Sequence, residues 1–208
     1  MAASPADPRH VNAHAGGFDA MYAGQPPWDI GRPQAAFVAL ADAGLIRGRV
    51  LDAGCGTGEH VLMCAALGLD ATGVDLAQVA LRAAEKKARA RGLTARFIRQ
   101  DARHLSELGE IFDTVLDCGL FHLPLFTEED RASYVAGLRS VLGEGGRYFM
   151  LCFSDREPGS TGPLRLTQDQ IRTAFAGGWQ IDSIDPATIE ITTDPAGVRA
   201  WLVAATRR

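Results

Sequence analysis

Short apolar runs alternate along the chain with segments in which apolar residues recur at helical spacing. The runs of strand length occupy residues 49–53, 69–74, 95–99, 111–118 and 147–153. Helical patterns cover residues 34–46, 59–67, 76–91 and 127–142. Because strands that alternate with helices pair most readily side by side in parallel, this order predicts an α/β protein.

The C-terminal part departs from this regular alternation. Residues 154–166 contain two prolines and two glycines and predict an irregular loop, a candidate lid at the ligand edge of the sheet. Thr167 and Gln170 have the spacing of a capping box, so a helix is expected from there to Phe175. Residues 179–184 and 198–204 predict the last two strands, with 189–192 as an uncertain extension. We expect residues 1–17 to be a flexible tail and 18–208 to form one domain.

Three glycines follow the first predicted strand, in the run Gly54-Cys55-Gly56-Thr57-Gly58. Glycine allows a positive φ and lets a ligand approach the backbone closely. Between a strand and a helix, such a run predicts a cradle at the carboxyl edge of a parallel sheet, where open α/β folds bind small ligands. A tight turn without any ligand is the plain alternative, and three alternating glycines disfavour it.

The spacing of these glycines argues against two phosphate-binding motifs. The dinucleotide fingerprint needs a glycine at position 59, where this chain has Glu59. A carboxylate at the start of the helix repels a pyrophosphate but tolerates an ammonium group. The P-loop is excluded because no Gly-Lys-Ser/Thr sequence follows. A nicotinamide-dependent oxidoreductase therefore remains only a second candidate.

Asp75 ends the second predicted strand, 19 positions after Gly56. At this distance a βαβ unit places an acid where its carboxylate can accept hydrogen bonds from both ribose hydroxyls of a nucleoside. The alternative is a helix N-cap, which aspartate also favours.

The run Val50-Leu51-Asp52-x-Gly54-Cys55-Gly56-Thr57-Gly58 resembles the first motif of the class I S-adenosylmethionine-dependent methyltransferases, and the order of elements over residues 30–205 is similar. The resemblance implies a Rossmann-like, seven-stranded, mostly parallel sheet with helices on both faces and an antiparallel edge hairpin. It implies that the glycine loop passes the methionine part of S-adenosylmethionine, and that S-adenosylhomocysteine is the product. It also implies that Asp101 accepts a hydrogen bond from the adenine amino group, with a helix cap as the alternative. The expected cofactor contacts are Trp28, Asp52, Gly54, Cys55, Gly56, Thr57, Gly58, Asp75, Leu76, Asp101, Ala102, Asp117 and Cys118.

Residues 18–33 contain Tyr-x-Gly-x-x-Pro-Trp-Asp-x-Gly-x-Pro, which is similar to a segment of small-molecule methyltransferases of the thiopurine, thiol and halide type. In that group the segment folds over the cofactor, so the resemblance implies that Trp28 lies against the methionine end. An indole face there would meet the sulfonium charge. Alternatively, Trp28 is a core side chain beneath a loop.

The loop after the fourth strand is the expected meeting point of methyl group and acceptor. Phe121 and His122 are predicted to face the acceptor pocket, and His122 is the candidate base for an acceptor that must lose a proton. The alternative for His122 is a satisfied polar residue at a loop–helix junction. Because the sulfonium charge disappears during transfer, we expect the enzyme to act mainly through proximity and desolvation.

Composition limits the choice of partners. The formal net charge of −4 disfavours nucleic acid. The chain lacks a long apolar run and an N-terminal signal pattern, which predicts a cytoplasmic protein without a membrane segment. The four cysteines lack metal-ligand spacing and are expected to be free thiols, and no metal site is predicted. We expect a monomer or homodimer that methylates a small, fairly apolar molecule at thiol sulfur, heterocyclic nitrogen or phenolic oxygen. A non-catalytic S-adenosylmethionine-binding protein remains open.

Overall fold

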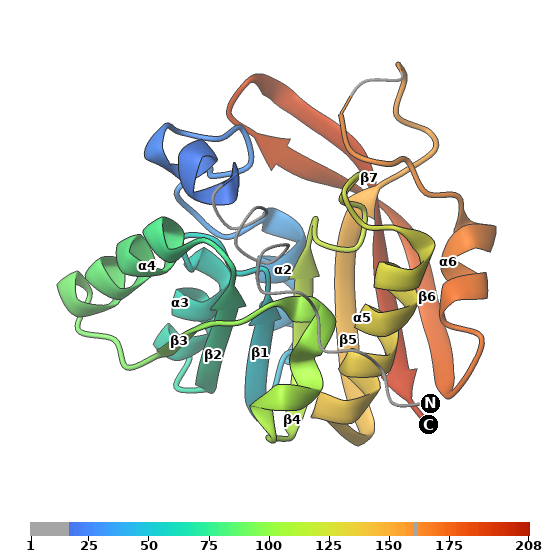
Figure 1. Cartoon of the computed structure of the whole chain (residues 1–208), viewed down its shortest axis with the longest axis horizontal. Helices are drawn as coiled ribbons and strands as arrows, with labels where there is room; N and C mark the ends of the chain where they lie inside the picture. The colour runs from blue at the N-terminus through green and yellow to red at the C-terminus, as the bar shows by residue number, and fades with distance from the viewer. Residues whose placement is uncertain (1–16, 160–161) are drawn as a thin grey trace.

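The computed structural model describes residues 17–159 and 162–208, and these build one seven-stranded sheet in the order β3-β2-β1-β4-β5-β7-β6 (Figure 1). The first five strands are parallel to one another, and β7 runs antiparallel to both of its neighbours. The predicted fold class is thereby confirmed. The strands are β1 Arg49–Ala53, β2 Asp70–Asp75, β3 Arg96–Arg99, β4 Phe112–Cys118, β5 Leu142–Phe153, β6 Trp179–Ile191 and β7 Asp194–Arg207.

Helices cover both faces of the sheet. They are α2 Ala35–Asp42, α3 Glu59–Ala66, α4 Gln78–Ala90, α5 Glu128–Val141 and α6 Gln168–Ala174, with residues 17–23 also helical. A 3₁₀ helix, η1 Ala102–Leu108, was not predicted. One buried cluster joins α5, α6 and η1 to the sheet, and a second joins α2, α3 and α4. In β5, Tyr148 and Met150 belong to the first cluster and Phe149 and Leu151 to the second, as the alternation of strand side chains requires.

The β6–β7 hairpin is longer than the sequence pattern predicts. The pattern predicts a strand over residues 179–184 with 189–192 as an uncertain extension, and β6 runs without a break from Trp179 to Ile191 through Pro186. Proline is tolerated because β6 is an edge strand, where one side of the backbone needs no partner. Since Phe153 at the end of β5 pairs with Ala200, the hairpin residues 194–199 extend beyond the carboxyl end of β5. Figure 1 shows this hairpin tip at the same edge of the sheet as the segment of residues 17–33.

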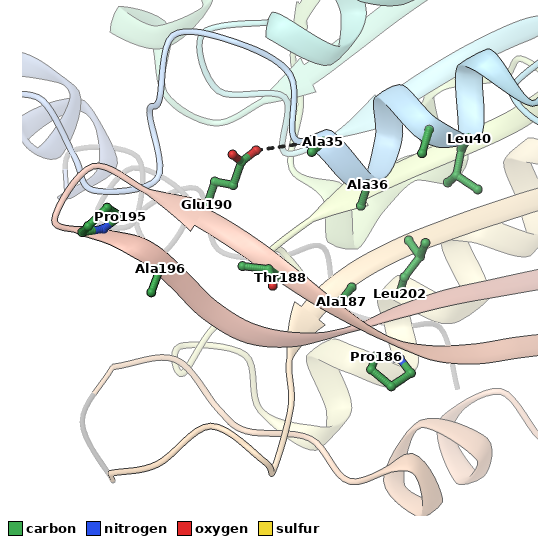
Figure 2. A pocket seen from close by; sticks show the side chains of 11 residues that line it. Ala35, Ala36, Leu40, Pro186, Ala187, Thr188, Glu190, Pro195, Ala196 and Leu202 are labelled. Atoms are coloured by element: carbon green, nitrogen blue, oxygen red, sulfur yellow. Dashed lines mark hydrogen bonds between the residues drawn. The ribbon is translucent and has the colours of Figure 1, made fainter.

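A hollow of about 520 Å³ lies between α2 and the hairpin (Figure 2). Small and apolar side chains such as Ala36, Pro186 and Leu202 form most of its wall. Its one ionisable lining residue, Glu190, already accepts a hydrogen bond from the backbone N–H of Ala35 at 3.1 Å. The hollow therefore offers little chemistry. None of the helices in the described part of the chain is both long and apolar enough to cross a bilayer.

Candidate active site

The main cavity, of about 670 Å³, lies at the carboxyl edge of the sheet. Its volume is within the range of small-molecule sites. The wall combines the glycine loop, the ends of β2 and β3, the loop after β4, part of loop 154–166, the hairpin tip and residues 18–33, called the strap below. Of the expected cofactor contacts, ten line this cavity: Trp28, Gly54, Cys55, Gly56, Thr57, Asp75, Leu76, Asp101, Ala102 and Cys118.

Gly56 and Gly58 show what the glycine loop requires. Both have positive φ, +51° and +84°. A Cβ on Gly56 would lie 2.5 Å from the hydroxyl of Tyr22, so glycine is needed for the strap to approach the loop. A Cβ on Gly58 would lie 2.7 Å from the Cβ of Ala84, and Gly58 does not line the cavity. The glycine at 58 thus allows packing against α4, and its predicted contact with the cofactor stays a prediction.

Asp75 fixes the glycine loop from the end of β2. Its Oδ2 accepts the backbone N–H of Gly56 at 2.8 Å, and its Oδ1 accepts that of Ala77 at 2.8 Å. Burial raises the pKa of the Asp75 carboxyl, and the hydrogen bonds from the two backbone N–H groups offset this only in part. The loop and the acid therefore form one hydrogen-bonded unit at the cavity wall.

Asp101 is held by a residue that the sequence analysis did not single out. The guanidinium of Arg103 donates to its Oδ2 at 2.6 Å, and the Arg103 backbone N–H donates to Oδ1 at 2.9 Å, which caps η1. Burial opposes ionisation, but the bonds from Arg103 keep the pKa of Asp101 below its usual value. Arg103 also reaches Asp130 at 3.1 Å. The capping alternative for Asp101 is thus present, and its carboxylate still lines the cavity.

Polar contacts attach the strap to the glycine loop and to α4. Thr57 donates from Oγ1 to Asp29 at 2.8 Å, and the backbone N–H of Val79 donates to Asp19 at 2.9 Å. The indole of Trp28 donates to the hydroxyl of Tyr22 at 3.0 Å. Trp28 lines the cavity and is 45% exposed, so the alternative of a core side chain is wrong.

The other end of the strap is attached to the hairpin. Arg32 makes a bidentate pair with Glu190, at 2.8 and 2.9 Å. The backbone N–H of Thr192 donates to the carbonyl of Pro27 at 2.8 Å. Segments more than 150 residues apart in the chain therefore meet over the cavity. Neither Glu190 nor the hairpin tip carried a sequence motif that would have revealed this.

Glu59 does not present an unbalanced charge. Its carboxylate pairs with Lys87 at 2.8 Å and with Arg91 at 2.9 Å. Burial raises the pKa of Glu59, but these two partners outweigh it and hold the pKa below its usual value. Because these two cations screen the carboxylate, Glu59 repels a pyrophosphate less than the sequence alone suggests.

Two acids at strand ends lie outside the cavity wall. Asp52 is 1% exposed and does not line the cavity; the Nδ1 of His60 lies 3.6 Å from its Oδ2. Asp117 is fully buried and accepts hydrogen bonds from the hydroxyls of Tyr134 at 3.0 Å and Tyr148 at 2.8 Å. Its Oδ1 accepts the backbone N–H of Leu120 at 2.8 Å. The expectation that Asp117 borders a ligand is wrong, because its oxygens are directed to the core and to the following loop.

Phe121 is also misplaced by the sequence analysis. Its ring is 2% exposed and packs near Tyr134 and Phe175 in the core, with centroids 6.4 and 5.7 Å away. It does not line the cavity. Leu120, its neighbour in the chain, lines the cavity instead. In the turn after β4, the side chain of Phe121 is therefore buried in the core and that of Leu120 faces the cavity.

His122 does line the cavity but in a form unsuited to a base. Its Nδ1 accepts the backbone N–H of Phe153 at 2.7 Å. Burial lowers the pKa of the imidazole to about 3. A ring with this pKa is neutral near pH 7 and a weak proton acceptor, so the role of general base is not supported. The alternative, a histidine whose hydrogen bonds are made within the loop junction, holds for Nδ1, which accepts the bond from Phe153.

A protein-family model described as a methyltransferase domain matches residues 50–146. The 2-heptyl-1-hydroxyquinolin-4(1H)-one methyltransferase of Mycobacteroides abscessus is 33% identical over 176 residues, which cover 83% of this chain and 76% of that protein. The chain is a class I S-adenosylmethionine-dependent methyltransferase. This methyltransferase is also 28% identical to a probable thiol methyltransferase of Arabidopsis thaliana, over 74% of this chain and 68% of the other.

Solved structures agree with this assignment. One described as "Conversion of a Disulfide Bond into a Thioacetal Group during Echinomycin Biosynthesis" is 39% identical, has a TM-score of 0.85, and is covered over 93% of each chain. Magnesium protoporphyrin IX methyltransferase from Synechocystis with bound S-adenosylmethionine shares the fold, with a TM-score of 0.64 at 20% identity. The enzyme uses S-adenosylmethionine, and a nicotinamide-dependent oxidoreductase is no longer a candidate. Its acceptor is a small molecule.

Proposed function

We propose that this methyltransferase acts on a mostly apolar small molecule whose attacking atom carries no proton during transfer. Such acceptors are a thiolate, an unprotonated heterocyclic nitrogen, or the anion of an acidic hydroxyl. The observation that carries the proposal is the fixed, neutral His122 in a cavity wall that also contains many apolar side chains. Phenols and alcohols that need a base to remove their proton are disfavoured.

The glycine loop, Asp75 and Asp101 would hold the cofactor. Gly54 and Gly56 line the cavity without side chains, so a ligand can approach the loop backbone closely, which suits a bound methionine moiety. Each carboxylate oxygen has a second lone pair, so Asp75 can accept from ribose hydroxyls while it keeps its bonds to Gly56 and Ala77. When bound, S-adenosylmethionine supplies an electrophilic methyl group.

Apolar side chains form much of the remaining wall of the cavity. They come from the loop after β4, the end of β5 and the hairpin: Leu120, Leu123, Leu125, Phe126, Phe153, Ile189, Ile191 and Val198. Such a wall excludes water and favours an acceptor with an apolar body. With the strap held at both ends, the enclosed acceptor would be aligned with the methyl group.

Two further ionisable side chains of the cavity wall, Tyr22 and Cys118, are not bases either. Burial raises the pKa of the Tyr22 hydroxyl and of the Cys118 thiol well above neutral values, so both keep their protons. The acceptor must therefore lose its own proton to water before transfer, if it has one to lose. The names of two relatives are consistent with this, because an N-hydroxyl and a thiol ionise more readily than an alcohol.

A binding measurement and an acceptor panel test the proposal together. S-adenosylhomocysteine should raise the melting temperature and NAD should not; ligand at ~100 times its dissociation constant adds about 2.7 kcal/mol of stability. With labelled S-adenosylmethionine, an aryl thiol and an N-hydroxyquinolone should be methylated, whereas an aliphatic alcohol of the same size should not. Equal turnover of the alcohol would contradict the proposal. An equal thermal shift with NAD would contradict the assignment of the cavity.

A further inference from the structure

His122 is held by three contacts that leave its ring little freedom. Its Nδ1 accepts the N–H of Phe153 at 2.7 Å, and its ring lies edge-on to the Phe153 ring, with centroids 4.7 Å apart. Its own carbonyl oxygen accepts the N–H of Leu164 at 3.0 Å. The imidazole is therefore positioned by the end of β5, and the backbone of His122 is held by loop 154–166.

These contacts determine which nitrogen carries the proton. A neutral imidazole has one donor and one acceptor nitrogen. Because Nδ1 accepts from a backbone amide, the proton must lie on Nε2. Burial alone lowers the pKa of the ring to about 3, so this neutral Nε2–H form persists throughout the working range of an enzyme.

The Nε2–H group is directed to the cavity without a protein partner. Nε2 makes no hydrogen bond to any residue in the described part of the chain. It is not one of the fully enclosed unpartnered atoms, so it keeps access to the cavity. Nε2 would lie 3.1 Å from a Cβ on Gly119, another residue of the cavity wall. The Nε2–H group is therefore available to donate to a molecule in the cavity.

We propose that His122 is a neutral hydrogen-bond donor to the anionic nucleophile of the acceptor, a thiolate or a heteroaryl oxyanion. This inference rests on the proposed function and narrows its acceptor class. The acceptor gives its proton to water and binds as an anion. A lone pair of its sulfur or oxygen then forms a bond to the methyl carbon. The bond from that carbon to the cofactor sulfur breaks, with the electron pair remaining on sulfur, and two neutral products result. His122 keeps its proton throughout.

A donor of this kind acts on the pKa of the bound acceptor. The apolar wall raises the pKa of a bound thiol or hydroxyl, whereas a hydrogen bond to its anion lowers it. Titratable residues of the surrounding segments also line the cavity: Cys118 from β4, Glu157 and Arg165 from loop 154–166, and Asp194 from the hairpin tip. Arg165 donates to the carbonyls of Glu157 and Pro158, and Glu157 accepts the backbone N–H of Arg199.

Two substitutions separate the donor role from a merely structural one. In His122→Asn, the amide oxygen can take the place of Nδ1 and accept from Phe153, but the Nε2 donor is lost. In His122→Gln, the amide nitrogen can reach the position of Nε2, but the contact with Phe153 is lost. If His122 only supports the loop, the Gln variant should be the more impaired one. The donor role predicts the reverse order.

The spectrum of bound 4-nitrophenol, a chromogenic hydroxyl, gives a readout that does not depend on turnover. The full-length protein is saturated with S-adenosylhomocysteine, and the fraction of bound phenolate is followed against pH. We expect the pKa of the bound probe to be at least about one unit higher in His122→Asn than in the wild type, because the hydrogen bond to the phenolate is lost. One unit corresponds to a tenfold change in the ratio of phenolate to phenol. His122→Gln should remain close to the wild type. Equal values in all three proteins would contradict the donor role.

Kinetics with a series of thiophenols provide the second test. Below the pKa of the bound thiol, kcat should be ~10- to 100-fold lower in His122→Asn, because less of the bound thiol is ionised without the hydrogen bond. The ascending limb of kcat should move to higher pH in that variant, while the limb of kcat/KM follows the free thiol in every protein. Thermal shifts with S-adenosylhomocysteine show that each variant is folded and binds. If S-adenosylhomocysteine does not bind the wild type, the proposed function is wrong. If it binds and the two variants lose activity equally, only the proposed role of His122 is wrong.

Discussion

Four aspartates lie near the carboxyl ends of the parallel strands β1 to β4, and their environments differ. Asp75 and Asp101 line the cavity and hold backbone N–H groups of the loops beside them. Asp52 and Asp117 are buried beside them without reaching the cavity. A carboxylate can serve a ligand only if it keeps lone pairs and access, and among these four the first two have both. The binding role we propose is thus restricted to Asp75 and Asp101.

Replacing Asp75 with asparagine should weaken cofactor binding. One acceptor oxygen is lost and the charge is removed, so affinity for S-adenosylhomocysteine should fall by roughly 1.5–3 kcal/mol, the contribution of hydrogen bonds to a charged group. Since Asp75 also holds Gly56, the melting temperature should fall too. Isothermal titration calorimetry measures the first effect and thermal denaturation the second.

A second ligand separates these two roles of Asp75. The 2′-deoxyribose analogue of S-adenosylhomocysteine should bind less tightly than the parent compound to the wild type. In Asp75→Asn the two ligands should bind almost equally, because the acceptor of the hydroxyl has been removed. If removal of the hydroxyl costs the same in both proteins, Asp75 acts only on the glycine loop and the ribose assignment is wrong.

At the scale of elements, the strap connects the two halves of the site. It contacts the glycine loop through Asp29 and the hairpin through Arg32. Exposed ion pairs contribute little by themselves, but the Arg32–Glu190 pair is bidentate and the strap is also held by backbone bonds. The strap is therefore positioned to respond to whatever occupies the cavity.

Trp28 should report cofactor binding by fluorescence. Its indole is half-exposed on the cavity wall, whereas Trp179 and Trp201 are 5% and 2% exposed and do not line the cavity. Binding of S-adenosylhomocysteine should change the emission of the wild type, and Trp28→Phe should remove most of that change. Trp201→Phe is the matched control and should leave it intact. A signal that survives in Trp28→Phe would place the responding tryptophan elsewhere.

The sequence predicted elements better than side-chain directions. Local periodicity and glycine spacing are encoded over a few neighbouring residues, so the strands, most helices and the cradle were predicted. The direction of a side chain in a loop depends on distant partners. Asp117 is turned inward by tyrosines 17 and 31 positions away, and His122 by a backbone amide 31 positions away. Likewise, β6 passes through Pro186 only because the sheet ends there, which a local pattern does not reveal.

For the whole molecule, the buried Asp117 carries an energetic cost that varies with pH. Burial raises its pKa from 3.8 to about 6, although hydrogen bonds from Tyr148, Leu120 and Tyr134 oppose the shift. Between these two values the unfolded chain has lost a proton that the folded protein retains. The folded state therefore loses stability as pH rises through this interval, by about 3 kcal/mol in total at 1.36 kcal/mol per unit.

Replacing Asp117 with asparagine should remove this pH dependence. The amide oxygen can accept from Leu120, and the amide nitrogen can donate to tyrosine hydroxyls, which rotate to accept. The free energy of unfolding, measured by urea denaturation from pH 4 to pH 7, is compared between the two proteins, so that the titration of all other groups cancels. The stability of Asp117→Asn relative to the wild type should rise with pH, by up to about 3 kcal/mol, and level off above pH 6. A difference that stays constant over this range would mean that Asp117 ionises as readily in the folded protein as in the unfolded chain, despite its burial between two tyrosines.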